Sequence, residues 1–282
     1  NYGSHQRSAA ILAAVLDEHD QHPTSQEIID YIVANPDPKL PSQLGIEDAL
    51  LAMVYRDGMP PESIGYNRGW VRNLTETAHP LAEAGYDLFE NPRFQKFLQW
   101  PFDVTIAGQF VPPMGDTGDM FARGDVLGSD ILQKIISHFH DPRFIAQLRE
   151  NPGSSHDLFE VPVEDLLEQI PQAEPEPYGL DPQLFPGYGL AYLQNGGEAN
   201  RTASLLSYSD HPQHCHYDQL NMMLFSQGNA MLTDLGYPEQ TDPFNHKRFA
   251  FFNNTVAHNT VVVNAGKQER GPGQLHAFQP TG

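Results

Sequence analysis

The sequence predicts a protein of two domains, in which a helical part precedes a β-sheet part. Residues 1–150 carry helix-type patterns, an acidic and proline-rich stretch follows over 151–186, and residues 187–282 contain short β-type runs. Helices first and strands afterwards are typical of two separate domains and not of an alternating α/β fold. We therefore expect a helical domain over 1–150, a linker over 151–186 and an antiparallel sheet domain over 187–282.

The helices of the first half are predicted from apolar-rich stretches that are bounded by Pro, Gly or Asp. These stretches are 8–20, 26–34, 46–56, 62–77, 81–90, 92–98, 129–140 and 142–148. Successive helices of this length with short breaks favour helical hairpins that pack side by side. Residues 108–128 carry too much Gly, Pro and Asp for a helix, so we expect a loop there.

The second half is predicted from a change of period after the linker, which itself contains one short helical pattern at 163–169. Short β-type runs are separated by turn residues, as at Asn195-Gly196-Gly197. The predicted strands are 188–194, 201–208, 220–226, 230–235 and 259–264.

Composition excludes several classes of protein. Lys and Arg sum to 16 and Asp and Glu to 36, so the formal net charge is 16 − 36 = −20. Duplex DNA and anionic membranes are bound by clustered basic residues, so neither is expected as the main partner. No stretch approaches the roughly 18 consecutive apolar residues of a membrane span. We expect a soluble globular protein, and its first residue, Asn1, indicates a piece of a longer chain.

A histidine-rich segment opens the sheet half of the chain. His214 and His216 lie two residues apart, so in an extended segment their imidazoles project to the same face. Asp234 follows His216 past a Gly-Asn turn that brings the next strand back, and His258 comes later still. Imidazoles and carboxylates are ligands of Zn²⁺ in proteins. The spacing therefore predicts a zinc site made of two imidazoles and one carboxylate.

A second kind of metal site is compatible with the same segment. His216, Asp218 and His258 form the two-His-one-carboxylate pattern of Fe(II) oxygenases, and Arg270 supplies the arginine that binds a co-substrate carboxylate. Those enzymes are built on a single β-barrel, which gives no reason for a long helical domain before it. A non-heme Fe(II) oxygenase is therefore the alternative.

The residues around the histidines resemble a known family. The run HCHYDQLNMMLFSQGNAMLTDLGY (214–237), followed by AHNTVVVNAGKQ (257–268), resembles the heparinase II/III family of polysaccharide lyases. In that family a His-x-His-x-Asp segment enters a strand pair ending in Asp-x-Gly-Tyr, and a later strand opens with His-Asn-Thr. Upstream, DGMPPESIGYNRG (57–69) resembles the segment with the family's tyrosine, and PPMGDTGD (112–119) resembles its interdomain loop.

The resemblance implies an incomplete (α/α) toroid followed by an antiparallel β-sandwich-type domain, in a chain truncated at both ends. This architecture agrees with the α-then-β order. The resemblance also implies zinc, in a mainly structural role, on His216, Asp234 and His258, and catalytic roles for His214 and Tyr66.

The resemblance further implies groups that bind the substrate. The opening segment NYGSH resembles the family's site for the substrate carboxylate, in which either Asn1 or His5 is the binding group. Arg68 and Arg248 are candidates for binding uronate or sulfate, because guanidinium groups bind such anions in a bidentate manner.

The implied activity is cleavage of a uronic-acid polysaccharide, alginate-like or glycosaminoglycan-like, by β-elimination. Removing the C5 proton places a second negative charge beside the carboxylate, which must therefore be neutralised, here by Asn1 or His5. Neutral His214 suits the base. Tyr66 suits the base only if positive charge lowers its pKa, and it can also protonate the departing O4. The allocation depends on the uronate epimer.

The expected partner, an acidic polysaccharide, has the same sign of charge as the protein. The segment 245–270 nevertheless contains four basic residues against one acid, Glu269, so we expect a locally basic or neutral cleft on an acidic body. The resemblance implies a periplasmic or secreted protein. A non-catalytic carbohydrate-binding protein of the same fold is the remaining alternative.

Overall fold

The structure is a computed structural model of the 282-residue chain. It describes residues 2–16, 22–36, 38–118, 126–153, 161–170, 178–197, 200–208, 213–237 and 246–280. The chain divides into two compact units, each built from several stretches of sequence. The helical unit comprises Asn1–Gly58, Arg68–Gln99 and Leu127–Glu176. The sheet unit comprises Met59–Asn67, Trp100–Val126 and Pro177–Gly282. The predicted domain borders stay predictions.

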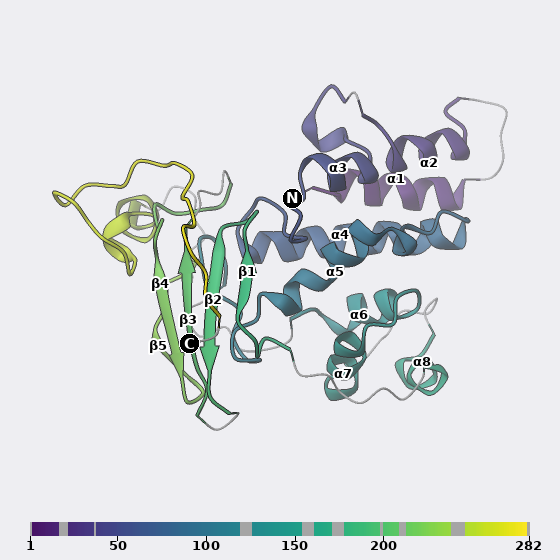
Figure 1. Ribbon diagram of the computed structural model, residues 1–282. Coiled ribbons are helices and arrows are strands. Elements are labelled where there is room, and N and C mark those ends of the chain that lie inside the picture. The colour runs from purple at the N-terminus through teal and green to yellow at the C-terminus, as the bar shows by residue number, and fades with distance from the viewer. Residues whose placement is uncertain are drawn as a thin grey trace. The chain divides into compact units, whose positions relative to one another are not determined.

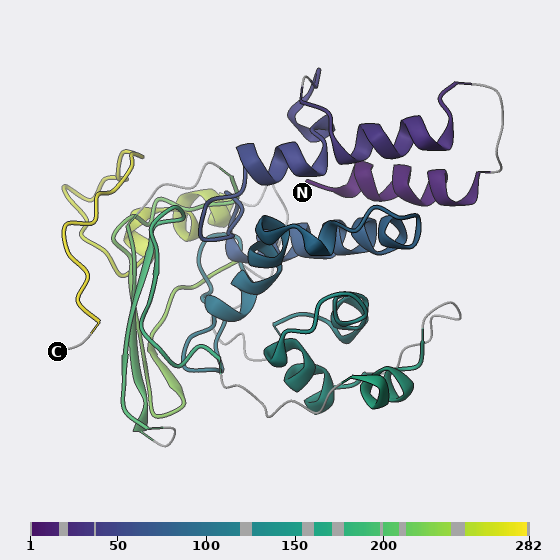
Figure 2. The ribbon, with the colours of Figure 1, turned by 45° about the vertical axis from the view of Figure 1, so that its right-hand side comes forward.

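Helices occupy most of the described first half of the chain. They are α1 Ser4–Val15, α2 Ser25–Val33, α3 Ile46–Ala52, α4 Ile64–Glu83, α5 Pro92–Asp103, α6 Ser129–Ile136, α7 Pro142–Glu150 and α8 Val163–Gln169 (Figure 1). Helices α1 and α2 lie side by side as a hairpin (Figure 2). A capping box begins α2, because the Thr24 hydroxyl accepts the backbone N–H of Glu27 while the Glu27 carboxylate accepts that of Thr24.

The core of the helical unit is aromatic and aliphatic. Its fully buried side chains include Trp70, Leu74, Phe94, Phe97, Leu132, Ile135 and Phe144. Burial of such side chains contributes about 1.5–3 kcal/mol each, which is the main stabilising term for amphipathic helices of this length.

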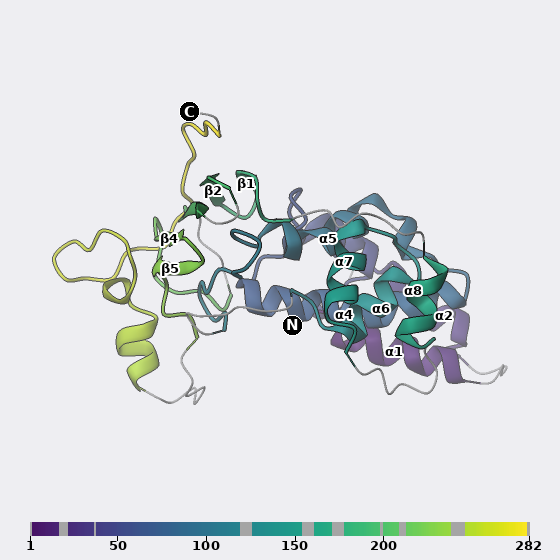
Figure 3. The same ribbon diagram turned by 90° about the horizontal axis from the view of Figure 1, so that it is seen from below.

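Within the described residues, the sheet unit contains one five-stranded antiparallel sheet whose strands follow one another in chain order. The strands are β1 Gln183–Phe185, β2 Leu190–Asn195, β3 Thr202–Ser207, β4 Met222–Ser226 and β5 Asn229–Leu232 (Figure 1, and from below in Figure 3). The helix-then-sheet order predicted from the sequence is confirmed.

One face of the sheet is buried and fixes its register. Tyr192, Leu205 and Met223 pair across β2, β3 and β4, and all three are fully buried. The Tyr192 hydroxyl donates to the carbonyl of Val104 at 2.7 Å, and the rings of Phe110 and Phe225 lie 4.9 Å apart. Val104 and Phe110, which precede the central strands in sequence but belong to the same unit, therefore help to cover this face.

Helix α4 differs from its prediction, because it runs through Pro80 and no separate helix forms over 81–90. Pro80 removes one helical hydrogen bond and crowds the preceding turn, but its carbonyl still accepts from Ala84 at 3.2 Å, and the helix extends to Glu83. A short 3₁₀ helix, Leu88–Glu90, forms after it.

The sheet also differs from its prediction at both ends. Strand β1 lies inside the predicted linker, of which residues 154–160 and 171–177 lie outside those described. Residues 259–264 join no ladder in the described part of the chain, and Val261 and Val263 are 71% and 68% exposed. The branched side chains favour a strand, but propensity alone does not form one without a paired neighbour.

Among the described residues, no helix is long and apolar enough to cross a membrane.

Candidate active site and metal centre

The loop of residues 115–118, here called the central loop, connects three segments of the sheet unit. Its backbone and the Thr117 hydroxyl make hydrogen bonds of 2.8–2.9 Å with Gly65, His214 and Tyr237. These residues belong to the start of α4, the histidine segment and the loop after β5. The central loop therefore brings together residues that are more than a hundred positions apart in the sequence.

Two glycines permit this close approach. Gly115 has φ +57°, and a Cβ atom on it would lie 2.6 Å from the carbonyl oxygen of His214. Gly236 has φ +62°, and its Cβ would lie 2.4 Å from the carbonyl oxygen of Gly118. Both positions combine a left-handed backbone with backbone contact, so no other residue fits without a shift.

The carboxylate of Asp116, on the central loop, accepts hydrogen bonds from three side chains. Its donors are His214 Nδ1 and His216 Nε2, each at 3.2 Å, and an Nη atom of Arg248 at 2.6 Å. Burial by itself raises the pKa of Asp116, but the hydrogen bond from His216, the charge of Arg248 and the hydrogen bond from His214 hold it below its usual value. The group is therefore ionised at neutral pH.

The histidine segment is not extended as expected. His214 has φ +56°, which is left-handed backbone, so the expected projection of both imidazoles from an extended segment is wrong. The two imidazoles nevertheless both contact the carboxylate of Asp116. The left-handed backbone at His214 and this shared contact bring them together, and not the alternation of side chains along a strand.

Tyr66 lies in the first turn of α4 and stacks on His214. Their ring centroids are 3.5 Å apart, with an angle of 9° between the planes. The other nitrogen of His214, Nε2, lies 3.6 Å from a carboxylate oxygen of buried Glu62. A phenol and an imidazole in contact, next to buried carboxylates, are the groups that general acid–base catalysis uses.

The surroundings of Tyr66 decide its protonation state. Burial, the hydrogen bond with Tyr237 and the nearby charges of Tyr237 and Asp116 raise the pKa of Tyr66 to about 12, although Arg248 lowers it. The positive charge of Arg248 is therefore outweighed by the influences that raise the pKa of Tyr66. The phenol is protonated at neutral pH and does not meet the condition for a base.

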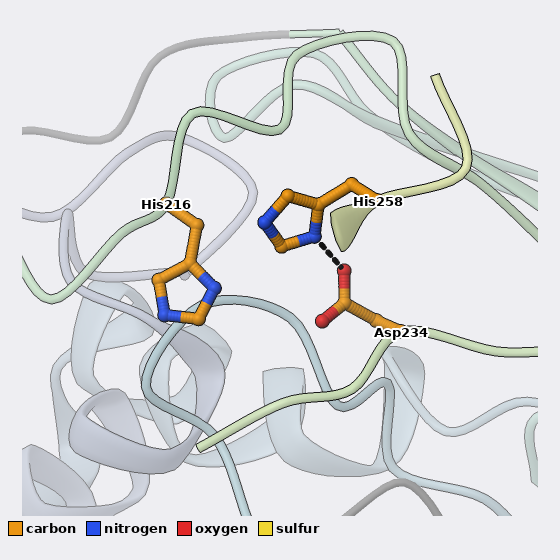
Figure 4. A group of neighbouring side chains, drawn as sticks. All are labelled: His216, Asp234 and His258. Atoms are coloured by element: carbon orange, nitrogen blue, oxygen red, sulfur yellow. Dashed lines mark hydrogen bonds and ion pairs between the residues drawn. The ribbon is translucent and has the colours of Figure 1, made fainter. Parts of the chain in front are cut away.

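A buried group suited to a metal ion lies in the same unit. His216, Asp234 and His258 each offer one ligand atom, and these atoms lie within 4.8 Å of one another (Figure 4). Asp234 follows β5, where its carboxylate accepts from His258 Nδ1 at 2.8 Å and from the Asn221 amide at 2.5 Å. Among the described residues, this group contains Asp234 and not the Asp218 of the oxygenase pattern.

Two buried nitrogen atoms test whether the group fits a metal. His216 Nδ1 and His258 Nε2 have no hydrogen-bond partner among the described residues. Buried polar atoms are normally paired, and an unprotonated imidazole nitrogen is a good metal ligand. In Figure 4, His216 Nδ1 faces the space between the three side chains, and His258 Nε2 lies on the edge of its ring nearer His216. The group therefore fits an ion.

The remaining predicted residues are dispersed. His5 is exposed on α1, and Arg68 is half-buried on α4, and both belong to the helical unit. Asn1 lies outside the described residues. Arg248 belongs to the sheet unit, where its guanidinium lies over the ring of Tyr237 at 5.0 Å as well as on Asp116. Roles for these residues towards a substrate stay predictions.

Sequence reasoning missed Asp116, Glu62 and Tyr237 as members of this site. All three lie in segments that carry the family resemblance, so the signal was present as a motif. Their contacts with the histidines depend on the fold and have no fixed spacing.

Comparison with known proteins bears out the resemblance. Residues 179–275 match the family model described as heparinase II/III-like, C-terminal. The resemblance to this family, expected from the motifs, is confirmed over that range. None of the curated proteins is a significant match to the sequence.

Solved structures share the fold. A structure titled as heparinase III has a TM-score of 0.67 and 17% identity, covering 96% of this chain and 40% of that one. Another heparinase III has a TM-score of 0.65, 14% identity and coverage of 98% and 39%. The heparan sulfate lyase HepC from Pedobacter heparinus has a TM-score of 0.52, 14% identity and coverage of 92% and 39%. The chain thus spans about two fifths of the length of these structures.

Proposed function

We propose that this chain carries the catalytic site of a polysaccharide lyase, which cleaves a uronic-acid polysaccharide by β-elimination and leaves a 4,5-unsaturated uronate end. The observation that supports it most is the stacked pair of Tyr66 and His214 beside ionised Asp116. The match to the heparinase II/III-like family supports the reaction class. The titles of the similar structures support a glycosaminoglycan-like uronan, and an alginate-like one is compatible with the same chemistry.

The protonation states assign the two roles. His214 removes the C5 proton, the C4–O4 bond breaks as the C4=C5 double bond forms, and Tyr66 gives its phenol proton to O4. Tyr66 suits the acid because its raised pKa keeps the proton on the phenol until the leaving oxygen takes it. This assignment narrows the choice that the sequence left open for Tyr66.

The substrate carboxylate needs a partner of its own. We assign this role to Asn1 or His5, with Arg68 as a further anion-binding group. The guanidinium of Arg248 is paired with Asp116 and its side chain is only 15% exposed. Arg248 would therefore contact the substrate only through this small exposed part. The architecture that we propose for these residues is an incomplete (α/α) toroid followed by a β-sandwich-type domain.

The metal that we propose is zinc, held by His216, Asp234 and His258. Two imidazoles and a carboxylate are a common zinc donor set, and a bound ion would cross-link the segments before β4, after β5 and at residue 258. Its role is structural, so His216→Ala should chiefly destabilise the fold. A polysaccharide substrate also supports a periplasmic or secreted location.

A substrate panel tests the proposal. The chain is incubated with heparan sulfate, other glycosaminoglycans and alginate, and the ultraviolet absorbance of the unsaturated uronate is followed. We expect product from at least one uronan, and loss of product in Tyr66→Phe and in His214→Ala. Tyr55→Phe, on a tyrosine of the helical unit, is the matched control and should keep the activity.

The opposing outcomes are distinct. Turnover retained in a well-folded Tyr66→Phe, His214→Ala double variant would contradict the assigned roles. Binding of a uronan without any rise in absorbance would favour a non-catalytic carbohydrate-binding protein. Activity that depends on Fe(II) and 2-oxoglutarate, with no zinc in a metal assay, would favour the oxygenase.

A further inference from the structure

Among the described residues, Asp116 makes hydrogen bonds with both His214 and His216, and the proposed reaction gives it no role. Its side chain is 2% exposed, and its two oxygens serve different partners. Oδ1 accepts from His216 Nε2, and Oδ2 accepts from His214 Nδ1 and from Arg248. One carboxylate therefore touches a proposed metal ligand and the proposed catalytic base.

The chemistry of these contacts fixes where the imidazole protons lie. An ionised carboxylate only accepts hydrogen bonds, so each nitrogen that faces Asp116 must carry a proton. The proton of a neutral His216 is thus on Nε2, and that of a neutral His214 is on Nδ1. The opposite nitrogens, His216 Nδ1 and His214 Nε2, are then left with free lone pairs.

Each free lone pair is where the site needs it. His216 Nδ1 is one of the two buried nitrogens without a partner, and it faces Asp234 and His258. His214 Nε2 is on the side of the ring away from Asp116, 3.6 Å from a carboxylate oxygen of Glu62, and the imidazole is 33% exposed. The same carboxylate therefore prepares one ring to bind a metal and the other to accept a proton.

The carboxylate is itself held rigidly. The backbone N–H of Asp116 donates to the carbonyl of His214 at 2.8 Å, and its own carbonyl accepts from the Ser63 hydroxyl at 3.2 Å. The guanidinium of Arg248 balances its charge at 2.6 Å. A carboxylate whose backbone and charge are both held in this way can orient the side chains that donate to it.

We propose that Asp116 is a positioning residue that sets the tautomers of His216 and His214 together, and so links the metal group to the catalytic base. The part that concerns His216 stands on the contacts of Asp116 with His216 and Arg248, and the part that concerns His214 rests on the proposed function. Removing a carboxylate that accepts a hydrogen bond from a metal-ligating histidine typically lowers metal affinity by about 10–100-fold.

The test uses zinc and the tautomers, and needs no activity. The chain is labelled with ¹⁵N at its imidazoles, and spectra at neutral pH are recorded without metal and with Zn²⁺. His214→Gln and His216→Gln assign the two signals. We expect the Nε2–H tautomer for His216 and the Nδ1–H tautomer for His214, and Zn²⁺ should shift His216 Nδ1. A His216 proton on Nδ1 in the unmodified chain would overturn the proposal, whatever any variant does.

The variant arm measures zinc affinity by competition with a chelator. Asp116→Asn keeps the size of the side chain but replaces one acceptor oxygen by an amide that donates, so zinc affinity should fall about 10–100-fold. Asp141→Asn, which removes a buried carboxylate of the helical unit, is the matched control and should leave affinity unchanged. A folded Asp116→Asn that binds zinc as tightly as the parent would overturn the proposal. Failure of the lyase assay touches neither readout, so the two proposals can fail separately.

Discussion

At the residue scale, the site depends on where protons lie. Asp116 is ionised and Tyr66 is neutral at pH 7, and both states follow from burial together with the charges packed around each group. Arg248 acts on both, since it lowers the pKa of each and is in direct contact with Asp116. A mutation of Arg248 would therefore change more than the binding of an anionic substrate.

The raised pKa of Tyr66 gives a direct spectroscopic prediction. In an absorbance titration of the tyrosinate band, the difference between the parent and Tyr66→Phe should correspond to one tyrosine that titrates near pH 12. The phenol is the acid below its pKa, so ionisation of Tyr66 should not reduce the rate of elimination between pH 7 and about 10. A difference curve centred below pH 10 would contradict the acid role and favour Tyr66 as a base.

At the scale of elements, the central loop holds the site together through backbone contacts. The site residues of this unit lie outside its strands, since His214 and His216 fall between β3 and β4, and Asp234 follows β5, which ends at Leu232. Asn221 is just before β4 and binds both Asp234 and the backbone of Asn259. The loops carry the chemistry, and the sheet fixes where they start and end.

Gly236→Ala tests the central loop. The new Cβ would lie 2.4 Å from the carbonyl oxygen of Gly118 at φ +62°, so we expect a loss of free energy of unfolding of about 2–4 kcal/mol from clash and strain together. Gly85→Ala, at φ +92° with nothing within 4 Å of its Cβ, isolates the backbone term and should cost only about 1 kcal/mol. Chemical denaturation measures both. Equal losses would mean that the close approach at Gly236 relaxes without cost.

Helix α7 gives a pH-dependent prediction. Asp141 caps its first turn and forms an ion pair with Arg143 at 2.8 Å. Burial by itself raises the pKa of Asp141. The hydrogen bonds and charge of Arg143, together with the hydrogen bond from Gln99, outweigh burial and lower this pKa below 3.8. A group whose folded pKa is depressed stabilises the fold above its unfolded pKa, and this stabilisation is lost as the pH falls through the folded value.

Asp141→Asn should therefore lower the free energy of unfolding by about 1–3 kcal/mol at pH 7. The difference from the parent should shrink below about pH 4, which urea unfolding at several pH values would measure. Asp165→Asn, at an exposed position of α8, is the control and should show little difference at any pH. A destabilisation that stays constant down to pH 2 would assign the effect to the loss of the cap geometry and not to the charge.

At the scale of the whole molecule, the net charge of −20 opposes compaction and disfavours a polyanionic ligand. Basic side chains nevertheless gather in the described segment 246–280, where Lys267 and Arg270 both lie over the ring of Tyr217, at 4.9 Å and 4.7 Å. The excess of acid is therefore not uniform, which fits the expected basic or neutral cleft.

Salt should act on stability in the direction that self-repulsion predicts. Raising NaCl from about 10 to about 150 mM shortens the Debye length from roughly 30 to 8 Å, which screens like charges. We expect the midpoint of thermal unfolding to rise by roughly 2–4 °C, equivalent to about 1 kcal/mol. Choline chloride at equal ionic strength is the control for specific ion effects. A fall in the midpoint would mean that attractive ion pairs outweigh the excess of acid.

The sequence by itself determined the order of helices and strands and the three residues of the metal group. The periodicity of apolar residues and the turn residues are local features of the sequence, so they indicate helices and strands directly. His216, Asp234 and His258 lie in a motif that the sequence itself makes recognisable. Only the tertiary structure decided which segments the central loop connects, which side chains contact Asp116, and that the pKa of Tyr66 is raised. Those depend on contacts between segments far apart in the chain and on burial, and neither leaves a fixed spacing in the sequence. The valines of 261–263 mark the same limit, because a strand needs a partner as well as a propensity.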